Sequence, residues 1–231
     1  MRKLVLFDID GTILLSSGAG RRAITDALAV HIGDATAFDR VRFDGKTDPQ
    51  IVFELLQAAG HPDPAQPARI AEVCEAYVER LAVELTHPAS TTTLLPGILA
   101  LLAELEARDD VLLGLVTGNV ARGAALKLRA AGVAPERFRV GAYGSDSAVR
   151  ADLPPIAAER AAVHMGRVPG GHDVVIIGDT PADVHCGRPI GARAIGVATG
   201  SYAAADLHAA GADAVFADLR DTPRVLDAIL A

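Results

Sequence analysis

The sequence predicts an α/β fold, a Rossmann-like parallel sheet core with a helical cap domain inserted after the first strand. Short apolar runs alternate with longer segments of helical periodicity, which is typical of a parallel sheet with helices on both faces. The gap between the first two apolar runs is too long for a single crossover and holds only helical patterns, so it predicts an inserted domain. Half of the 231 residues are hydrophobic, which is ample for a packed core.

The elements of the core follow in chain order from these runs. The first strand is expected at about 3–8, where Leu4 to Phe7 form an apolar run short enough to be a fully buried strand. Later strands are expected at 111–116, 137–140, 174–177, 194–197 and 214–216. Helices are expected between them at 97–107, 120–131, 153–166, 181–188 and 223–230.

The inserted segment has helical patterns at 20–31, 48–59 and 67–86, with no clear strand pattern. Ser16 to Gly20 open it and Thr91 to Gly97 close it, and both segments have the composition of a hinge. We therefore expect an α/β core at 1–15 and 91–231 and a helical cap domain at 16–90.

The composition excludes several classes of partner. With 22 basic and 29 acidic residues the net charge is −7, and the absence of a basic run argues against nucleic acid. No apolar run approaches the roughly 20 residues of a membrane span, and the N-terminal apolar run is too short for a signal peptide. Cys74 and Cys186 form no metal or redox motif, which fits a reduced, cytoplasmic protein.

Asp8 and Asp10 follow the first strand directly, with Gly11 and Thr12 after them. Alternation places the two carboxylates on the same side of the chain, where they repel each other unless a cation lies between them. In an open α/β sheet this edge is where ligands bind. The pair therefore offers a nucleophile, a second acid and part of a metal site, although an acidic turn would also explain it.

Two later strands end in polar residues of the same kind. Thr117, Gly118 and Asn119 lie between a strand and a helix, so they form an anion site or simply cap that helix. Asp179 ends the strand at 174–177 and Asp183 lies one helical turn later. Favourable acids at a Pro-initiated helix would explain this second pair locally, but not why four aspartates gather at two strand ends.

Three motifs in this order resemble the haloacid dehalogenase superfamily of phosphotransferases. FDIDGT at 7–12 matches its nucleophile motif, LVTGN at 115–119 its phosphate-binding motif and IGDTPAD at 177–183 its acidic motif. The insert at 16–90 has the position and helical character of one type of cap in that family. Gly45 to Asp48 add a likeness to phosphoglycolate phosphatase-like members.

The resemblance implies a role for each of these residues. Asp8 would attack phosphorus and form an aspartyl-phosphate, while Asp10 would protonate the leaving oxygen and then activate water. Mg²⁺ would be held by the Asp8 carboxylate, the Asp10 backbone carbonyl and Asp179, with Asp183 in support. The transferring phosphoryl group would be bound by Thr117, Gly118, Asn119 and a basic residue.

The basic residue departs from the family pattern. The family usually places a Lys before the helix that corresponds to 153–166, but no Lys follows Lys127 in this chain. Arg150 lies at about the right place and Arg160 is the alternative. Arg21, Arg22 and Lys46 could contact a substrate from the cap, although solvated surface charges are the simpler interpretation, as they are for the seven histidines.

The resemblance predicts a Mg²⁺-dependent phosphatase that hydrolyses a small phosphate monoester, a phosphorylated metabolite, through an aspartyl-phosphate. A phosphomutase similar to β-phosphoglucomutase would keep the same core residues. A 2-haloacid dehalogenase on the same fold would need neither the acid at Asp10 nor a set of metal ligands. A non-enzymatic phospho-acceptor signalling domain would carry its aspartate on a middle strand and lack the long insert.

Overall fold

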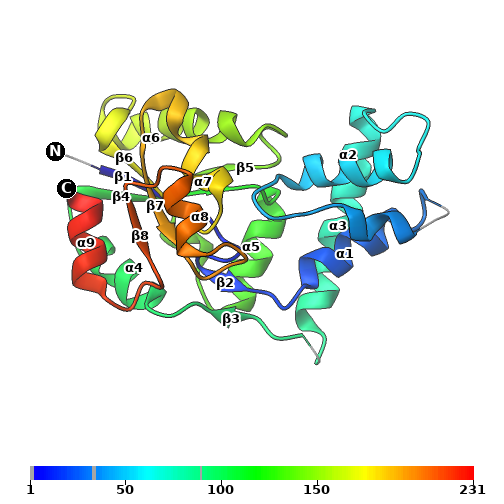
Figure 1. Ribbon diagram of the computed structural model, residues 1–231, viewed down its shortest axis with the longest axis horizontal. Helices are drawn as coiled ribbons and strands as arrows, with labels where there is room; N and C mark the ends of the chain where they lie inside the picture. The colour runs from blue at the N-terminus through cyan, green and yellow to red at the C-terminus, as the bar shows by residue number, and fades with distance from the viewer. Residues whose placement is uncertain (1–2, 33–34, 89) are drawn as a thin grey trace.

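A parallel sheet of six strands forms the centre of the computed structural model, which describes residues 3–32, 35–88 and 90–231 (Figure 1). The strand order is β5-β4-β1-β6-β7-β8, and every neighbouring pair is parallel. The predicted fold class is therefore confirmed. The strands are β1 (Lys3–Phe7), β4 (Val111–Thr117), β5 (Val140–Tyr143), β6 (Val174–Gly178), β7 (Arg193–Val197) and β8 (Ala214–Phe216).

Strand β1 lies between β4 and β6, and this position brings distant segments together. Phe7 pairs with Leu115 of β4 and with Ile177 of β6, so the three strands end at the same edge. The chain leaves β1 toward β4 on one side and later returns to β6 on the other. Such a reversal opens a crevice at the carboxyl ends of the strands, where open α/β sheets bind ligands.

Helices cover both faces because side chains of each strand alternate between them. Val5 and Phe7 of β1 belong to the cluster packed by α4 (Ile98–Glu106), α5 (Ala121–Ala130) and α9 (Thr222–Leu230). Leu4 and Leu6 belong to the opposite cluster, with α6 (Leu153–Met165) and α7 (Pro181–Cys186). The short helix α8 (Ala204–Ala209) packs on β7 and β8.

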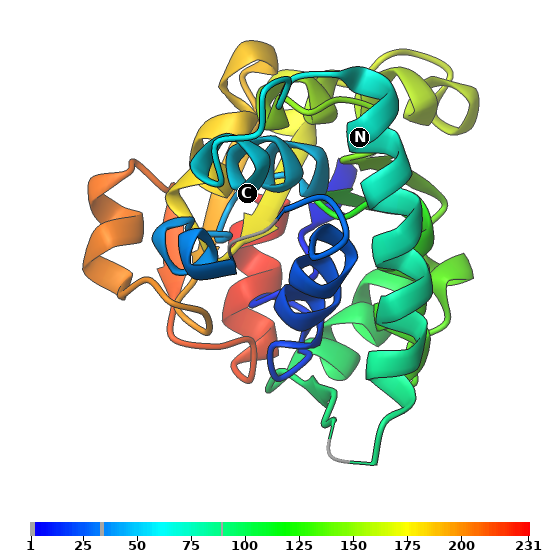
Figure 2. The same cartoon turned by 90° about the vertical axis from the view of Figure 1, so that its right-hand side faces the viewer.

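The inserted helices are α1 (Ala19–Leu28), α2 (Asp48–Ala58) and α3 (Pro67–Thr86), with a 3₁₀ turn at Ala35–Arg40. We call them the cap helices. They share a hydrophobic cluster of their own, which Val120 at the start of α5 joins from the core. Figure 1 shows them grouped at one end of the molecule, and Figure 2, viewed from that end, shows α1 beside α3.

A two-stranded antiparallel ribbon joins the two connections to the cap helices. It consists of β2 (Leu14–Leu15) and β3 (Thr93–Leu94). The ribbon lies next to the hinges expected at 16–20 and 91–97. The domain boundaries drawn from the sequence stay a prediction, and residues 1–2, 33–34 and 89 within those ranges lie outside the described residues.

One strand prediction is wrong in its position. The strand expected at 137–140 lies at Val140–Tyr143, and a 3₁₀ turn occupies Pro135–Arg137. Pro135 is the first residue of that turn, where its fixed φ suits helical geometry and its missing N–H costs no hydrogen bond. Phe138 is buried all the same, with its ring centroid 6.4 Å from that of Phe7, which explains the apolar signal before the strand.

No helix in the described part of the chain combines the length and apolar character that crossing a membrane requires.

Candidate active site

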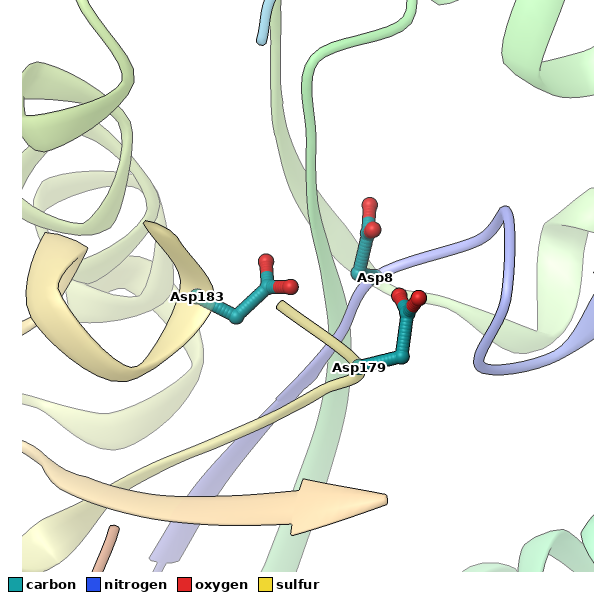
Figure 3. Close-up of side chains that lie close together, drawn as sticks. All are labelled: Asp8, Asp179 and Asp183. Atoms are coloured by element: carbon teal, nitrogen blue, oxygen red, sulfur yellow. The ribbon is translucent and has the colours of Figure 1, made fainter. Parts of the chain in front are cut away.

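Three carboxylates meet at the edge where β1 and β6 end. Asp8 follows β1, Asp179 follows β6 and Asp183 lies in the first turn of α7. Each offers an oxygen within 4.8 Å of the other two, and all three side chains are buried. Figure 3 shows the side chains converging from these three places. The register of β1 with β6 accounts for the meeting of Asp8 with Asp179, which lies 171 positions later in the chain.

Burial and mutual repulsion disturb the ionisation of this cluster. Burial, aided by the charges of Asp183 and Asp10, raises the pKa of Asp8 to about 7 despite the opposing effect of Arg150. Burial and then the charges of Asp183 and Asp8 raise the pKa of Asp179 to about 9. Carboxylates with such pKa values in a cleft are typical of functional sites.

Arg150 supplies positive charge to this cluster from the loop before α6. The guanidinium is buried, its Nη2 lies 3.3 Å from Asp8 Oδ1, and it also forms an ion pair with Asp183. Arg150 Nε is buried without a hydrogen-bond partner among the described residues. Arg160, the alternative, lies on the outer part of α6 and pairs with Asp146 at 2.7 Å.

The start of α7 fixes the position of Asp183. Its Oδ2 accepts hydrogen bonds from the Thr180 backbone N–H (3.0 Å) and hydroxyl (2.7 Å), and its own N–H donates to Thr180 Oγ1. This is a capping box, so the interpretation of Asp183 as a favourable acid in a first helical turn also holds. The same carboxylate reaches Arg150 through Oδ1.

Asp10 lies apart from the three buried carboxylates. Its side chain is 41% exposed, and its Oδ2 accepts from Asn119 Nδ2 at 2.8 Å and from Lys127 Nζ at 2.7 Å. Burial lowers the pKa of Lys127, but the charges of Asp10 and Asp48 outweigh it and raise the pKa above its ordinary value. Lys127 is therefore a charged, buried partner of Asp10.

The sequence reasoning missed Lys127, although a signal was present. Gly123, Ala124, Lys127 and Leu128 are the buried residues of α5, and they recur at the spacing of one helical face. A buried ammonium is costly without a partner, so a lysine in the middle of an otherwise apolar or small-residue face is expected to pair with an acidic side chain.

The phosphate-binding segment at the end of β4 is tightly enclosed. Thr117 is fully buried, and its Oγ1 accepts hydrogen bonds from the backbone and side-chain N–H groups of Asn119. A Cβ on Gly118 would collide with the Lys46 carbonyl, and the Gly118 carbonyl accepts from the Asp48 N–H at 2.7 Å. The loop before α2 is therefore seated directly on this segment.

Asp48 itself makes a second link between the cap helices and the core. Its buried carboxylate accepts a hydrogen bond from the Val120 N–H at 2.8 Å, at the start of α5. Burial raises its pKa to about 6, although Lys127 opposes the shift. The neighbouring Thr47 hydroxyl donates to the Ala148 carbonyl at 2.8 Å.

A cavity of about 580 Å³ lies between the sheet edge and the cap helices. Asp8, Asp10, Thr117, Arg150 and Asp179 line it from the core. The cap side contributes three basic residues and several apolar side chains. These basic residues are Arg21, Arg42 and Lys46.

The basic residues of the cap side already have partners. Lys46 pairs with Glu54, Arg42 lies 3.9 Å from Asp44, and the Arg21 guanidinium stacks 4.6 Å from the centre of the Phe43 ring. Arg22, by contrast, pairs with Glu84 away from the cavity lining. No histidine of the described residues lines the cavity.

The structure thus brings seven sequence-predicted residues to one cavity: Asp8, Asp10, Thr117, Gly118, Asn119, Arg150 and Asp179. Asp183 does not line the cavity, but it has an oxygen within 4.8 Å of Asp8 and Asp179. Their roles in catalysis stay predictions.

Comparison with known proteins places this arrangement in a family. Solved structures similar to the chain include CbbY from Rhodobacter sphaeroides in complex with phosphate (23% identity, TM-score 0.72, 96% of each chain covered). A predicted phosphoglycolate phosphatase from Haemophilus somnus 129PT matches at 19% identity and TM-score 0.72, over 97% of this chain and 98% of that one. A β-phosphoglucomutase from Clostridium difficile matches at 17% identity and TM-score 0.72, over 100% and 98%.

These likenesses establish the fold, and a search of curated proteins finds no significant match. The model of the haloacid dehalogenase-like hydrolases matches residues 5–188, which include all three motifs. The chain therefore belongs to the haloacid dehalogenase-like hydrolase family.

Proposed function

We propose that the protein is a Mg²⁺-dependent phosphatase that hydrolyses a small phosphate monoester through an aspartyl-phosphate on Asp8. The observation that carries the proposal is the position of Asp8. Asp8 lines the cavity beside buried Arg150, and one of its carboxylate oxygens lies within 4.8 Å of an oxygen of Asp179 and of Asp183. Nucleophile, cationic partner and candidate metal ligands are thus assembled in one place.

The buried carboxylates fit Mg²⁺. The donor set consists of carboxylate oxygens, which Mg²⁺ prefers. A Cβ on Gly11 or Gly200 would collide with the Asp179 carboxylate, so two glycines leave room around that group. Asp8, Asp179 and the Asp10 backbone carbonyl would hold the ion. Asp183 would support it with charge, because both its oxygens already bond to Arg150 and Thr180.

The first half-reaction transfers the phosphoryl group to the enzyme. An oxygen of the Asp8 carboxylate forms a bond to phosphorus while the bond from phosphorus to the ester oxygen breaks. The Asp10 carboxyl gives its proton to the departing oxygen, which leaves as an alcohol. Arg150 stabilises the negative charge that gathers on the phosphoryl oxygens, and bound Mg²⁺ supplies further charge neutralisation.

The second half-reaction restores the enzyme. Asp10, now ionised, takes a proton from water as the water oxygen bonds to phosphorus. The bond between phosphorus and Asp8 breaks, and inorganic phosphate and the free carboxylate result. Thr117, with the backbone of Gly118 and Asn119, holds the phosphoryl group during both steps.

This proposal is tested with a panel of phosphate monoesters in the presence of Mg²⁺. The panel includes phosphoglycolate, sugar phosphates and nucleotides. We expect phosphate release from at least one of them and its loss in Asp8→Asn, which keeps the shape of the side chain but not its nucleophilic charge. Mass spectrometry of acid-quenched wild-type protein should find the phosphoryl group on Asp8. Near-normal turnover by Asp8→Asn would contradict the covalent mechanism.

The same assays separate the alternatives. A phosphomutase would convert a sugar phosphate to its isomer with little release of inorganic phosphate. A dehalogenase would release halide from a 2-haloacid in the presence of a chelator.

A further inference from the structure

Lys127 is the buried cation that the proposed mechanism leaves without a role. It lies on α5 with its side chain 6% exposed, and its only ion pair among the described residues is with Asp10, at 2.7 Å. A buried ammonium is costly unless it is paired, and this one is paired with the residue that handles the proton.

The surroundings of Lys127 come from the cap side. Gly20 of α1 lies against it: a Cβ on Gly20 would be 3.3 Å from Lys127 Nζ and 3.7 Å from the Tyr77 hydroxyl of α3. Tyr77 is 1% exposed. The absence of a side chain at Gly20 therefore leaves the space in which the ammonium reaches Asp10 at the edge of the cavity.

Two donors hold one oxygen of the Asp10 carboxylate. Lys127 Nζ and Asn119 Nδ2 both donate to Oδ2, at 2.7 and 2.8 Å. No hydrogen bond within the described residues engages Oδ1, so this is the oxygen free to exchange a proton with the substrate. Rotation of the carboxylate that exchanged its two oxygens would break both of these hydrogen bonds.

We propose that Lys127 is a positioning residue for Asp10, which fixes the carboxylate so that Oδ1 serves as the acid and base of the reaction. The inference rests on the proposed function, in which Asp10 moves the proton. It assigns Lys127 no contact with the phosphoryl group, which Arg150 serves instead.

Lys127→Met tests the role, because methionine has a similar length and packs in the same space without the charge. Arg122→Met is the matched control: Arg122 lies on the same helix and pairs with Glu75 of α3, but it is exposed. Turnover is measured on an alkyl phosphate, whose leaving oxygen needs a proton, and the single-turnover burst is measured on p-nitrophenyl phosphate, whose phenolate leaves without one.

We expect Lys127→Met to lower kcat on the alkyl phosphate by about 10- to 100-fold, a part of what general acid–base catalysis contributes. The burst rate on p-nitrophenyl phosphate reports the first step alone and should stay near the wild-type value, and Arg122→Met should change neither quantity. In an Asp10→Asn background, Lys127→Met should cause no further loss of kcat, because the group it positions is gone.

A burst rate on p-nitrophenyl phosphate that falls as far as kcat on the alkyl phosphate, or an additive loss in the Asp10→Asn background, would overturn the role of Lys127 and leave the proposed function intact. A wild-type protein that hydrolyses no phosphate ester would overturn the proposed function and this inference together. Unfolding temperatures of the metal-free variants show whether Lys127→Met is folded. If it is not, Lys127→Gln provides the same comparison.

Discussion

Arg150 brings a fixed positive charge to the cluster of three buried carboxylates. The guanidinium contacts both Asp8 and Asp183 and is 8% exposed. Arginine pairs with planar oxyanions through two N–H groups, so it can serve a carboxylate and a phosphoryl group at once. Its buried Nε has no partner among the described residues, which leaves a donor to satisfy when substrate binds.

We predict that Arg150→Ala lowers kcat by two or more orders of magnitude, the effect of losing one charge-stabilising donor. Arg160→Ala is the control, since Arg160 bonds to Asp146 and the Gly141 carbonyl instead. Steady-state kinetics with the preferred ester measures both. A larger loss in Arg160→Ala than in Arg150→Ala would contradict the assignment.

For single residues, the sequence predicts the site residues that lie at strand ends. It does not predict those whose place in the site depends on how a helix packs. Asp8 and Asp179 could be expected together because parallel strands end at one edge of a sheet. The partnership of Lys127 with Asp10 depends on which face of α5 meets β1 and the cap helices, and that is a tertiary relationship. A buried position for Lys127 was readable from its helical spacing, but its partner was not.

Among the elements, the loop before α2 links the cap helices to the acidic motif at 177–183. Gly45 has a φ of +74°, and a Cβ there would lie 2.7 Å from Ala182 Cβ and 3.0 Å from Thr180 Oγ1. Asp179 and Asp183 flank those two residues. A side chain at position 45 would therefore push the loop away from the start of α7.

We predict that Gly45→Ala lowers kcat/KM by about tenfold or more, because small displacements of a positioned site are costly to turnover. Gly60→Ala is a matched control: its φ is +70°, but nothing lies within 4 Å of the added Cβ. Both variants carry the same backbone strain, roughly 1 kcal/mol. Gly45→Ala should lower the unfolding temperature at least as much as Gly60→Ala, because only it adds a steric clash to this strain, and only Gly45→Ala should impair turnover. Equal kinetics of the two would contradict this prediction.

Elements with strong periodicity were predictable, and those fixed by local turns were not. The helices at 48–59 and 67–86 agree with α2 and α3 within a residue because their apolar faces repeat over several turns. The strand expected at 137–140 begins later because Pro135 and its 3₁₀ turn come first. The ribbon of β2 and β3 is only two residues long in each strand, too short for any period to appear in the sequence.

For the molecule as a whole, the buried acids tie stability to pH and to metal. Asp8, Asp48 and Asp179 have pKa values of about 7, 6 and 9, all above the ordinary value of 3.8 because burial disfavours their charged forms. The folded, metal-free protein therefore binds protons that the unfolded chain releases over this range. Linkage then requires these groups to weaken stability as pH rises from about 4 toward these values.

We predict that between pH 5 and pH 8 the unfolding temperature of the metal-free protein falls more steeply with pH in the wild type than in Asp8→Asn, which cannot ionise at that position.

Mg²⁺ should raise the wild-type unfolding temperature, and more so at pH 8 than at pH 5, because a bound cation favours the ionised carboxylates. Sodium chloride at matched ionic strength is the control for screening. Calorimetry across this range measures both effects, and a Mg²⁺ effect that is absent at pH 8, or no smaller in Asp8→Asn than in the wild type, would contradict a metal site built on Asp8.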